Sequence, residues 1–303
     1  MKQSNLKVVF ITMEVTQVLH SLLESAKVVG LVESKRKNPS KQTNQLRDFC
    51  SERNLPYYFM NDGCSVNFEN WLKELEPDLI VIFGMSELLK KNIIDIPKKG
   101  CINLHPSLLP KYRGGYPIFW MYYHFDLNPG VTVHYIDEGE DTGNIIYQES
   151  INLPIGATEE EFFDNLINKI GIELLLRAIE DIEKDCAPSI QQQVDGSTKR
   201  ARQIRPEQYK EIIDWETWDI VRIWHLLRGT QNWLNVFDLS EIQGDIKKWR
   251  ILNYSCEDSP FELGKVFKED SQYFVSCGQG KIYMELTMEQ SEEVKKGFAK
   301  VVG

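Results

Sequence analysis

The chain has 303 residues, enough for about two domains, and its 42% hydrophobic and 26% charged residues are typical of a folded globular protein. Its 35 lysines and arginines stand against 45 aspartates and glutamates, a formal net charge of −10. This balance disfavours a protein whose surface must grip a nucleic-acid backbone, although it leaves room for a local basic patch.

Six cysteines are spread along the chain, without a CxxC pair and without histidines at zinc-finger spacing. This pattern predicts reduced thiols rather than disulfides or a structural zinc. The N-terminal residues have only a short apolar run at 8–12, and no stretch approaches the roughly 20 apolar residues that span a bilayer. We therefore expect a soluble cytoplasmic protein without a membrane partner.

The first half of the chain alternates apolar runs with amphipathic runs. Strands that are buried on both faces of a parallel sheet are apolar along their whole length, and helices of 10–12 residues suit the crossovers between them. The expected strands are 6–12, 26–32, 56–59, 78–83 and 100–104, and the expected helices are 15–23, 45–53 and 67–75. This rhythm predicts an α/β domain with a Rossmann-like, mostly parallel sheet and helices on both faces.

Two further strands are expected at 130–136 and 144–153, with Gly143 as a turn or bulge between them. Thr158 and Glu161 have the spacing of a capping box, which predicts the start of a long amphipathic helix that ends near residue 184.

The character of the chain changes after a polar stretch at 187–205, which contains few large apolar residues and reads as a linker. Beyond it a helix is expected at 215–229, and short strands at 249–253, 264–267, 273–276 and 281–286. We therefore expect a catalytic domain at 1–190, a linker at 191–205 and a small helix-plus-β domain at 206–303.

Several common motifs are absent. The chain has no GxxxxGK[ST] phosphate loop, no GxGxxG after the first strand, no HExxH and no GxSxG. The sequence therefore disfavours P-loop nucleotide binding, dinucleotide binding of the GxGxxG type, zinc proteases of the HExxH type and α/β-hydrolases with a GxSxG nucleophile.

The segment that begins at Asn103 carries the clearest chemical signal. Asn103 and His105 stand at the end of a buried strand, where open α/β sheets bind ligands, and period-2 geometry places them on one side of the chain. Pro106 and Pro110 then prevent a helix. A backbone-satisfied histidine and a turn-forming asparagine would explain the same residues, but both together at a strand end favour a site.

A second cluster, at 137–143, holds four carboxylates within five residues and follows the strand that carries His134. Such a run is often only an acidic surface loop. Asp141, which Thr142 and Gly143 follow, is the carboxylate that we expect to orient and stabilise an imidazole.

Taken in order, these motifs resemble the formyltransferases that use N10-formyltetrahydrofolate. They are Asn103-x-His105-Pro-Ser-Leu-Leu-Pro-x-Tyr-Arg-Gly, Gly130-Val-Thr-Val-His134 and Asp137-x-Gly139-x-Asp141-Thr-Gly143. That family includes glycinamide ribonucleotide formyltransferase, methionyl-tRNA formyltransferase and the sugar N-formyltransferases. Ile213-Asp214-Trp215, the following helix and the β segment to about residue 287 look like the C-terminal domain of methionyl-tRNA formyltransferase, a small OB-like barrel. The resemblance spans nearly the whole chain.

The resemblance implies a reaction in which a substrate amine attacks the formyl carbon of the folate. Asn103 would donate to the resulting oxyanion, His105 would transfer a proton, and Asp141 would set the imidazole tautomer and help to protonate the leaving nitrogen. N10-formyltetrahydrofolate is thus the expected co-substrate, and no metal is expected.

The resemblance also implies the binding residues. The folate would be held by the loop after the third or fourth strand and by the acidic loop, at Met85, Ser86, Leu88, Leu89, Ile136, Asp137, Glu138, Gly139 and Thr142. We place Thr12, Ser107, Tyr112, Arg113 and Gly114 around the acceptor. Arg113 could pair with a phosphate or carboxylate of that substrate.

Three acceptors compete within the family. Initiator methionyl-tRNA would need positive surfaces, yet residues 205–303 carry 13 basic against 17 acidic residues, and 1–204 carry 22 against 28. Glycinamide ribonucleotide would need a glycine-rich loop after the first strand and usually no β domain at the C-terminus. A nucleotide-linked amino sugar, such as a dTDP- or UDP-linked amino-dideoxy sugar for surface polysaccharide (lipopolysaccharide), needs only a local pocket, and we favour it.

Two alternatives stay open at this point: methionyl-tRNA formyltransferase, and a folate-binding relative that has lost transfer activity. The intact Asn103, His105 and Asp141 argue against the second. The aromatic and apolar content near the C-terminus permits a homodimer without requiring one.

Overall fold

The computed structural model describes residues 4–36, 43–195, 198–237, 239, 242 and 246–288. The chain divides into two compact units, and neither is one continuous stretch of sequence. The first comprises Met1–Trp120, Asn128–Asn152 and Phe162–Gln203, and the second Met121–Leu127, Leu153–Glu161 and Ile204–Gly303. The domain boundaries expected at 190 and 205 stay a prediction.

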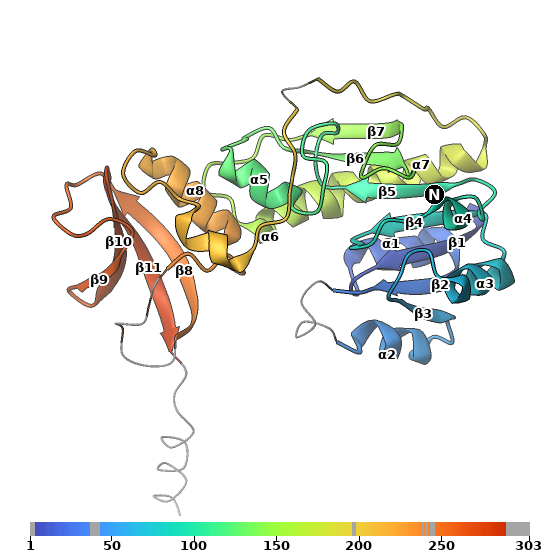
Figure 1. The fold of residues 1–303 in the computed structure, drawn as a ribbon, viewed down its shortest axis with the longest axis horizontal. Coiled ribbons are helices and arrows are strands. Elements are labelled where there is room, and N and C mark those ends of the chain that lie inside the picture. Colours follow the sequence, from blue (N-terminus) through green and yellow to red (C-terminus); the bar gives the residue numbers. More distant parts are fainter. Residues whose placement is uncertain are drawn as a thin grey trace, which may run out of the picture. The chain divides into compact units, whose positions relative to one another are not determined.

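The first unit is built on a seven-stranded sheet with the order β3-β2-β1-β4-β5-β6-β7 (Figure 1). The strands are β1 (Ser4–Thr12), β2 (Ala26–Ser34), β3 (Tyr57–Met60), β4 (Leu79–Phe83), β5 (Cys101–His105), β6 (Gly130–Tyr135) and β7 (Ile145–Ser150). β1 to β5 run parallel, while β6 and β7 are antiparallel. This confirms the predicted Rossmann-like, mostly parallel sheet.

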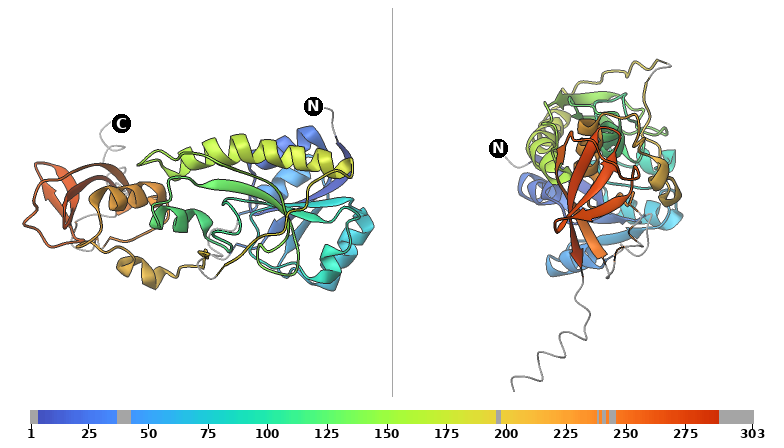
Figure 2. Two further views of the ribbon diagram at one scale, coloured as in Figure 1. Left: turned by 90° about the horizontal axis from the view of Figure 1, so that it is seen from above. Right: turned by 90° about the vertical axis from the view of Figure 1, so that its left-hand side faces the viewer.

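Helices cover both faces of this sheet because its central strands are apolar on both sides. Alternate β1 residues, Val9 and Ile11, pack in one core with Phe68, Leu72 and Ile93 of the helices α3 and α4. On the opposite face α7 runs along the strands with α1 beside it, as Figure 2 shows. The helices of this unit are α1 (Gln17–Ser25), α2 (Gln45–Glu52), α3 (Val66–Leu75), α4 (Lys91–Ile94) and α7 (Ile172–Glu183).

The predicted capping box forms. The Glu161 carboxylate accepts from Thr158 N at 2.8 Å, and the Thr158 hydroxyl accepts from Glu161 N at 3.3 Å. The expected long helix is present but not uniform, since α6 (Glu159–Phe162) leads into a π-helical segment, Phe163–Gly171, before α7 begins. The short helix α5 (Pro117–Tyr123) was not among the expected elements.

The second unit contains α8 (Ile220–Thr230) and a four-stranded antiparallel sheet with the order β8-β11-β10-β9. Its strands are β8 (Ile246–Ser255), β9 (Val266–Glu269), β10 (Gln272–Cys277) and β11 (Gly280–Met288), preceded by a 3-10 turn at Pro206–Glu211. The helix expected from residue 215 begins later, at Ile220, because Asp214 caps a turn and Asp219 is the N-cap of α8, accepting from Val221 N at 2.8 Å.

All six cysteines are free thiols. None of the helices within the described ranges has the length and apolar character that a membrane crossing demands.

Candidate active site

Two neighbouring strands bring three polar side chains to one edge of the sheet. Asn103 and His105 stand on β5, and His134 stands on β6 directly opposite Asn103. Because β5 and β6 are antiparallel and paired in register, cross-strand partners lie within side-chain contact distance. The amide Nδ2 of Asn103 lies 3.2 Å from Nε2 of His134.

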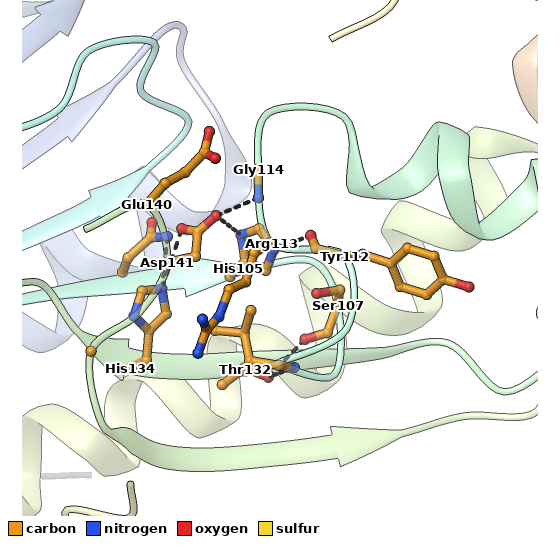
Figure 3. Close-up of polar contacts among 12 residues, drawn as sticks. His105, Ser107, Tyr112, Arg113, Gly114, Thr132, His134, Glu140 and Asp141 are labelled. Carbon is orange, nitrogen blue, oxygen red and sulfur yellow. Dashed lines mark hydrogen bonds and ion pairs between the residues drawn. The ribbon is translucent and has the colours of Figure 1, made fainter. Parts of the chain in front are cut away.

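Asp141, from the loop after β6, reaches between the two imidazoles (Figure 3). Its Oδ2 lies 3.6 Å from Nδ1 of His105, and its Oδ1 lies 3.7 Å from Nε2 of His134. The main-chain N–H of Gly114 donates to Oδ2 at 2.8 Å. The structure thus brings together the three residues that the sequence singled out, with His134 as a fourth.

Main-chain carbonyls set the protonation of both rings. Nδ1 of His134 lies 2.7 Å from the carbonyl oxygen of Tyr135, and Nε2 of His105 lies 3.1 Å from that of Tyr112. A carbonyl can only accept, so these two nitrogens carry protons. In neutral His134 the other nitrogen must then accept, and it receives an N–H of Asn103.

Burial keeps His134 neutral near pH 7. Its side chain is fully buried, and this desolvation, together with the neighbouring His105, lowers the pKa of His134 well below its ordinary value. His105 is also buried, while about 15% of the Asp141 side chain stays exposed. The unprotonated Nε2 of the buried His134 ring therefore orients the Asn103 amide. The second N–H of this amide is available to a ligand in the cavity, which Asn103 lines.

The loop that carries Asp141 needs unusual backbone geometry. Asp141 has φ of 55°, in the left-handed region that costs a non-glycine residue about 1 kcal/mol. Gly143 is required for close approach, since a Cβ there would lie 1.9 Å from the Tyr135 carbonyl oxygen. The sequence predicts a turn or bulge at Gly143; Gly143 lies in the loop before β7, and the β6–β7 register shift falls elsewhere, between Val133 and His134.

A cavity of about 340 Å³ opens beside this cluster. Twelve of the predicted site residues line it: Thr12, Met85, Ser86, Leu88, Leu89, Asn103, His105, Gly114, Ile136, Asp137, Gly139 and Asp141. Both predicted folate walls, the loop after β4 and the loop after β6, therefore face the same space.

The other predicted residues do not line the cavity, and four of them have partners elsewhere. Arg113 donates to Gln192 through Nε at 3.0 Å and through Nη2 at 2.6 Å. Ser107 donates to the Lys111 carbonyl at 2.8 Å. The Thr142 hydroxyl donates to the Asp137 carboxylate at 2.5 Å, and the Tyr112 carbonyl accepts a hydrogen bond from Nε2 of His105. Glu138 is exposed in the loop after β6. For these five, the predicted binding roles stay predictions.

Sequence reasoning gave no role to several residues at the site. His134 stands in the motif Gly130-Val-Thr-Val-His134, shortly before the acidic loop. Its position near Asp141 in the sequence could have indicated a place in the site. Arg36 and Glu14 also line the cavity and pair with each other at 2.7 Å. Phe163, which lies in the segment expected as a long helix, lines it too. Nothing in the spacing of Gln192 indicated that it contacts the Asp141 loop.

The cavity has the size and lining of a small-molecule site. Ligand pockets start at about 300 Å³ and mix apolar walls with a few polar groups. Leu89 and Ile136 supply apolar surface, and the loop that begins at Gly84, whose φ of 82° turns the chain sharply after β4, supplies main-chain groups. Within the described residues, no group of three or more histidine, cysteine or acidic side chains could hold a metal ion.

Comparison with known families decides the class of the protein. The model of the formyl transferase family matches residues 7–179, more than half of the chain. This chain belongs to the formyl transferase family. It is therefore an enzyme of the class that transfers a formyl group from N10-formyltetrahydrofolate.

Curated relatives in the family are methionyl-tRNA formyltransferases. The protein of Alkaliphilus oremlandii (strain OhILAs) is 32% identical over 236 residues, which is 77% of this chain and 73% of the relative. That of Clostridioides difficile (strain 630) is 41% identical over 143 residues, 47% of this chain and 46% of the relative.

Solved structures of related fold include sugar N-formyltransferases. The sugar 3N-formyltransferase WlaRD, solved with dTDP and 5-N-formyl-THF, is 18% identical, with a TM-score of 0.64 over 95% of this chain and 100% of that one. The Helicobacter canadensis N-formyltransferase, solved with folinic acid and dTDP-3-aminofucose, is 17% identical, with a TM-score of 0.61 over 94% and 100%. At such identities the likeness establishes the fold alone.

Proposed function

We propose that this formyltransferase acts on the amine of a nucleotide-linked amino sugar, of the dTDP- or UDP-linked amino-dideoxy kind, for surface polysaccharide. The observation that carries the proposal is charge. Neither part of the chain has a basic excess, with 22 basic against 28 acidic residues at 1–204 and 13 against 17 at 205–303. A tRNA acceptor depends on many cationic contacts with phosphates, whereas a sugar nucleotide needs only a few.

The lining of the cavity supports a small amine. Five acidic residues line it, namely Glu14, Glu87, Asp137, Glu140 and Asp141. Arg36 is the one arginine or lysine of the lining within the described residues. Such a surface attracts the ammonium form of an acceptor and repels a polyanion. Arg36 could exchange its partner Glu14 for the diphosphate of a sugar nucleotide.

The proposed roles follow from the geometry of the site. The acceptor nitrogen forms a bond to the formyl carbon, the bond from that carbon to N10 breaks, and the proton released by the amine ends on N10. Asn103 donates its second N–H to the oxygen that gains charge. His105 transfers the proton, and Asp141 stabilises the charge on the ring from 3.6 Å.

Methionyl-tRNA is the second candidate acceptor, because the curated relatives at 32% and 41% identity carry that name. The two candidates differ in their dependence on salt. Transfer to tRNA should weaken steeply as salt rises, since each phosphate contact releases counterions, while transfer to a sugar nucleotide should change little.

An acceptor screen tests the proposal. The full chain is incubated with N10-formyltetrahydrofolate and either a panel of dTDP- and UDP-linked amino sugars, including dTDP-3-aminofucose, or initiator methionyl-tRNA, and formylated products are measured by mass spectrometry. We expect a clear rate with at least one sugar nucleotide. A rate with methionyl-tRNA alone would overturn the choice of acceptor, and tetrahydrofolate binding without any transfer would favour an inactive relative.

Location and assembly belong to the same proposal. The six free thiols suit a reducing compartment, so we place the enzyme in the cytoplasm. A homodimer stays an expectation, which light scattering of the purified chain would test.

A further inference from the structure

The described residues 187–195 and 198–203 belong to the stretch that the sequence predicts to be a linker, and several of them contact the active-site loops. Ile190 pairs with Ile145 at the start of β7, and Ala201 N donates to the Arg113 carbonyl at 2.8 Å. Tyr112 N donates to the Lys199 carbonyl at 2.7 Å. All these contacts lie within the first unit. The described parts of this stretch therefore contact both loops that build the site.

Gln192 is the residue of this stretch that reaches inward. It is 9% exposed, and its amide donates to the carbonyl of Asp141 at 2.9 Å and to that of Gly143 at 2.7 Å. Its oxygen accepts from Nε and Nη2 of Arg113. Both N–H groups and both lone pairs of the amide are thus used, which is the full capacity of a glutamine.

These bonds fix the backbone on which the catalytic carboxylate stands. Asp141 has a left-handed φ of 55°, and Gly143 follows in a tight approach to the Tyr135 carbonyl. With both carbonyls anchored by one amide, the loop is restrained in the arrangement in which the carboxylate meets His105 and the Gly114 N–H. Arg113 in turn orients the Gln192 amide, because a guanidinium can only donate to the amide oxygen.

We propose that Gln192, held by Arg113, is a positioning residue for the reaction, which fixes the Asp141 loop so that the carboxylate lies between His105 and His134. The inference rests on the catalytic role proposed for Asp141. It assigns Arg113 to this support and not to the acceptor.

The chain supplies its own controls. Gln191 and Gln193 flank Gln192, and both are exposed. Gln191→Ala and Gln193→Ala therefore change the same residue type in the same segment without touching the loop. Gln192→Ala removes all four bonds, whereas Gln192→Glu keeps the size and the acceptor for Arg113 but presents oxygen to two carbonyls.

Histidine ring signals give a readout that needs no acceptor. The chain has only five histidines, so the ring nitrogen resonances in NMR spectra can be assigned by single replacements. We expect Gln192→Ala to shift the His105 and His134 signals in the same direction as Asp141→Asn does, while both control variants leave them in place. Unchanged His105 and His134 signals in folded Gln192→Ala and Gln192→Glu would overturn the proposal.

Kinetics provide the second readout, with N10-formyltetrahydrofolate as donor and dTDP-3-aminofucose and methionyl-tRNA as parallel acceptors. We expect Gln192→Ala and Gln192→Glu to lower kcat by about tenfold to a hundredfold with little change in KM for the donor, because misplacement of a catalytic group by an ångström costs this much. If Gln192→Ala fails to fold, Gln192→Glu and the ring signals decide. Loss of rate in Asp141→Asn but not in either Gln192 variant would reject this inference alone, and full rate in Asp141→Asn would reject the proposed role of Asp141.

Discussion

Asp141 lies between two imidazoles whose outer nitrogens are bound to main-chain carbonyls, His105 to Tyr112 and His134 to Tyr135. The inner nitrogens both face its carboxylate, at 3.6 and 3.7 Å. Only His105 of the two rings lines the cavity. Proton transfer with a substrate is therefore expected at the inner nitrogen of His105, while His134 acts on Asn103.

Removal of the proposed proton-transfer groups should slow the reaction and leave tetrahydrofolate binding nearly unchanged. We expect His105→Ala and Asp141→Asn each to lower kcat by about 10²–10⁴-fold, the usual contribution of a positioned acid or base. Tetrahydrofolate affinity, measured by calorimetry, should change little, because the apolar walls are untouched. A full rate in either variant would contradict the assigned roles.

His134 should matter through the orientation of Asn103. His134→Ala removes the acceptor for the Asn103 amide, so we expect kcat to fall by about 10²-fold, as when an oxyanion donor is lost, with KM for the donor nearly unchanged. His134→Gln can present a carbonyl oxygen to the same N–H, and it should recover part of the rate. A rise in KM with constant kcat would show instead that His134 serves binding.

Buried histidines should make stability depend on pH. His225 is fully buried, and desolvation lowers its pKa from 6.5 to about 4. Between these values the unfolded chain binds a proton at His225 that the folded chain does not, so the contribution of this group to stability is constant above pH 6.5 and falls as the pH drops toward 4. The slope is about 1.4 kcal/mol per pH unit for one such group.

Urea unfolding at a series of pH values measures this effect. His225→Gln should flatten the fall in the free energy of unfolding between pH 6.5 and 4. His20→Gln, a change at an exposed histidine, should leave it as in the parent protein. An equal slope in all three proteins would contradict this account.

The sequence predicts the three residues of the proposed catalytic site because each of them carries a local signal. Asn103 and His105 follow an apolar strand, and Asp141 stands beside Thr142 and a glycine. Gln192 has no such signal. It lies 51 residues from Asp141, and its role depends on a path of the chain that local patterns do not encode.

At the scale of elements, long apolar strands and amphipathic helices are predictable because burial dictates their patterns. β1, β2 and β4 were expected within two or three residues of their ends. α5 was not, because its run Pro-Ile-Phe-Trp-Met-Tyr-Tyr is aromatic and lacks a polar face that would show a helical period. The π-helical turn at Phe163–Gly171 was equally hidden, since its apolar stripe also fits an α-helix.

The Asp141 loop should not tolerate a larger residue at Gly143. A methyl group there would lie 1.9 Å from the Tyr135 carbonyl oxygen, so Gly143→Ala must displace the loop. We expect a loss of about 1–3 kcal/mol in the free energy of unfolding, as in overpacked cores. We also expect Gly143→Ala to lower kcat at a temperature at which the variant stays folded. Destabilisation alone would then not account for the loss of activity.

Gly100→Ala is the matched control, because a Cβ at that position meets nothing within 4 Å. It should cost about 1 kcal/mol for its φ of 81° and leave the rate unchanged. Equal effects of the two alanine variants on kcat would show that the close approach at Gly143 is not needed for catalysis.

At the scale of the whole molecule, the second unit draws on three separate stretches of chain. Tyr122, from the earliest stretch, is 1% exposed, and its ring lies 4.7 Å from that of His225 on α8. Gly156, from the next stretch, donates its N–H to His225 at 2.9 Å. The core of this unit therefore depends on segments that precede the polar stretch 187–205.

A chain cut at 203 should consequently be less stable than the full protein. The fragment 1–203 keeps residues 121–127 and 153–161 but loses the α8 side chains that cover them. We expect a lower Tm, and binding of a dye that detects exposed apolar surface, in thermal scans of the fragment beside the full chain. A fragment with an unchanged Tm and no dye binding would show that residues 121–127 and 153–161 do not need the C-terminal part of the second unit for their stability.

The interleaved path also limits how the second unit can be exchanged among relatives. A chimera joined at a single point near residue 205 would combine α8 of one parent with Tyr122 and Gly156 of the other, although Gly229 leaves no space for a methyl beside the Tyr122 ring. Grafting a foreign C-terminal unit therefore requires three matched transplants, not one. Divergence of this part of the enzyme should accordingly appear as coordinated substitutions in regions far apart in the chain.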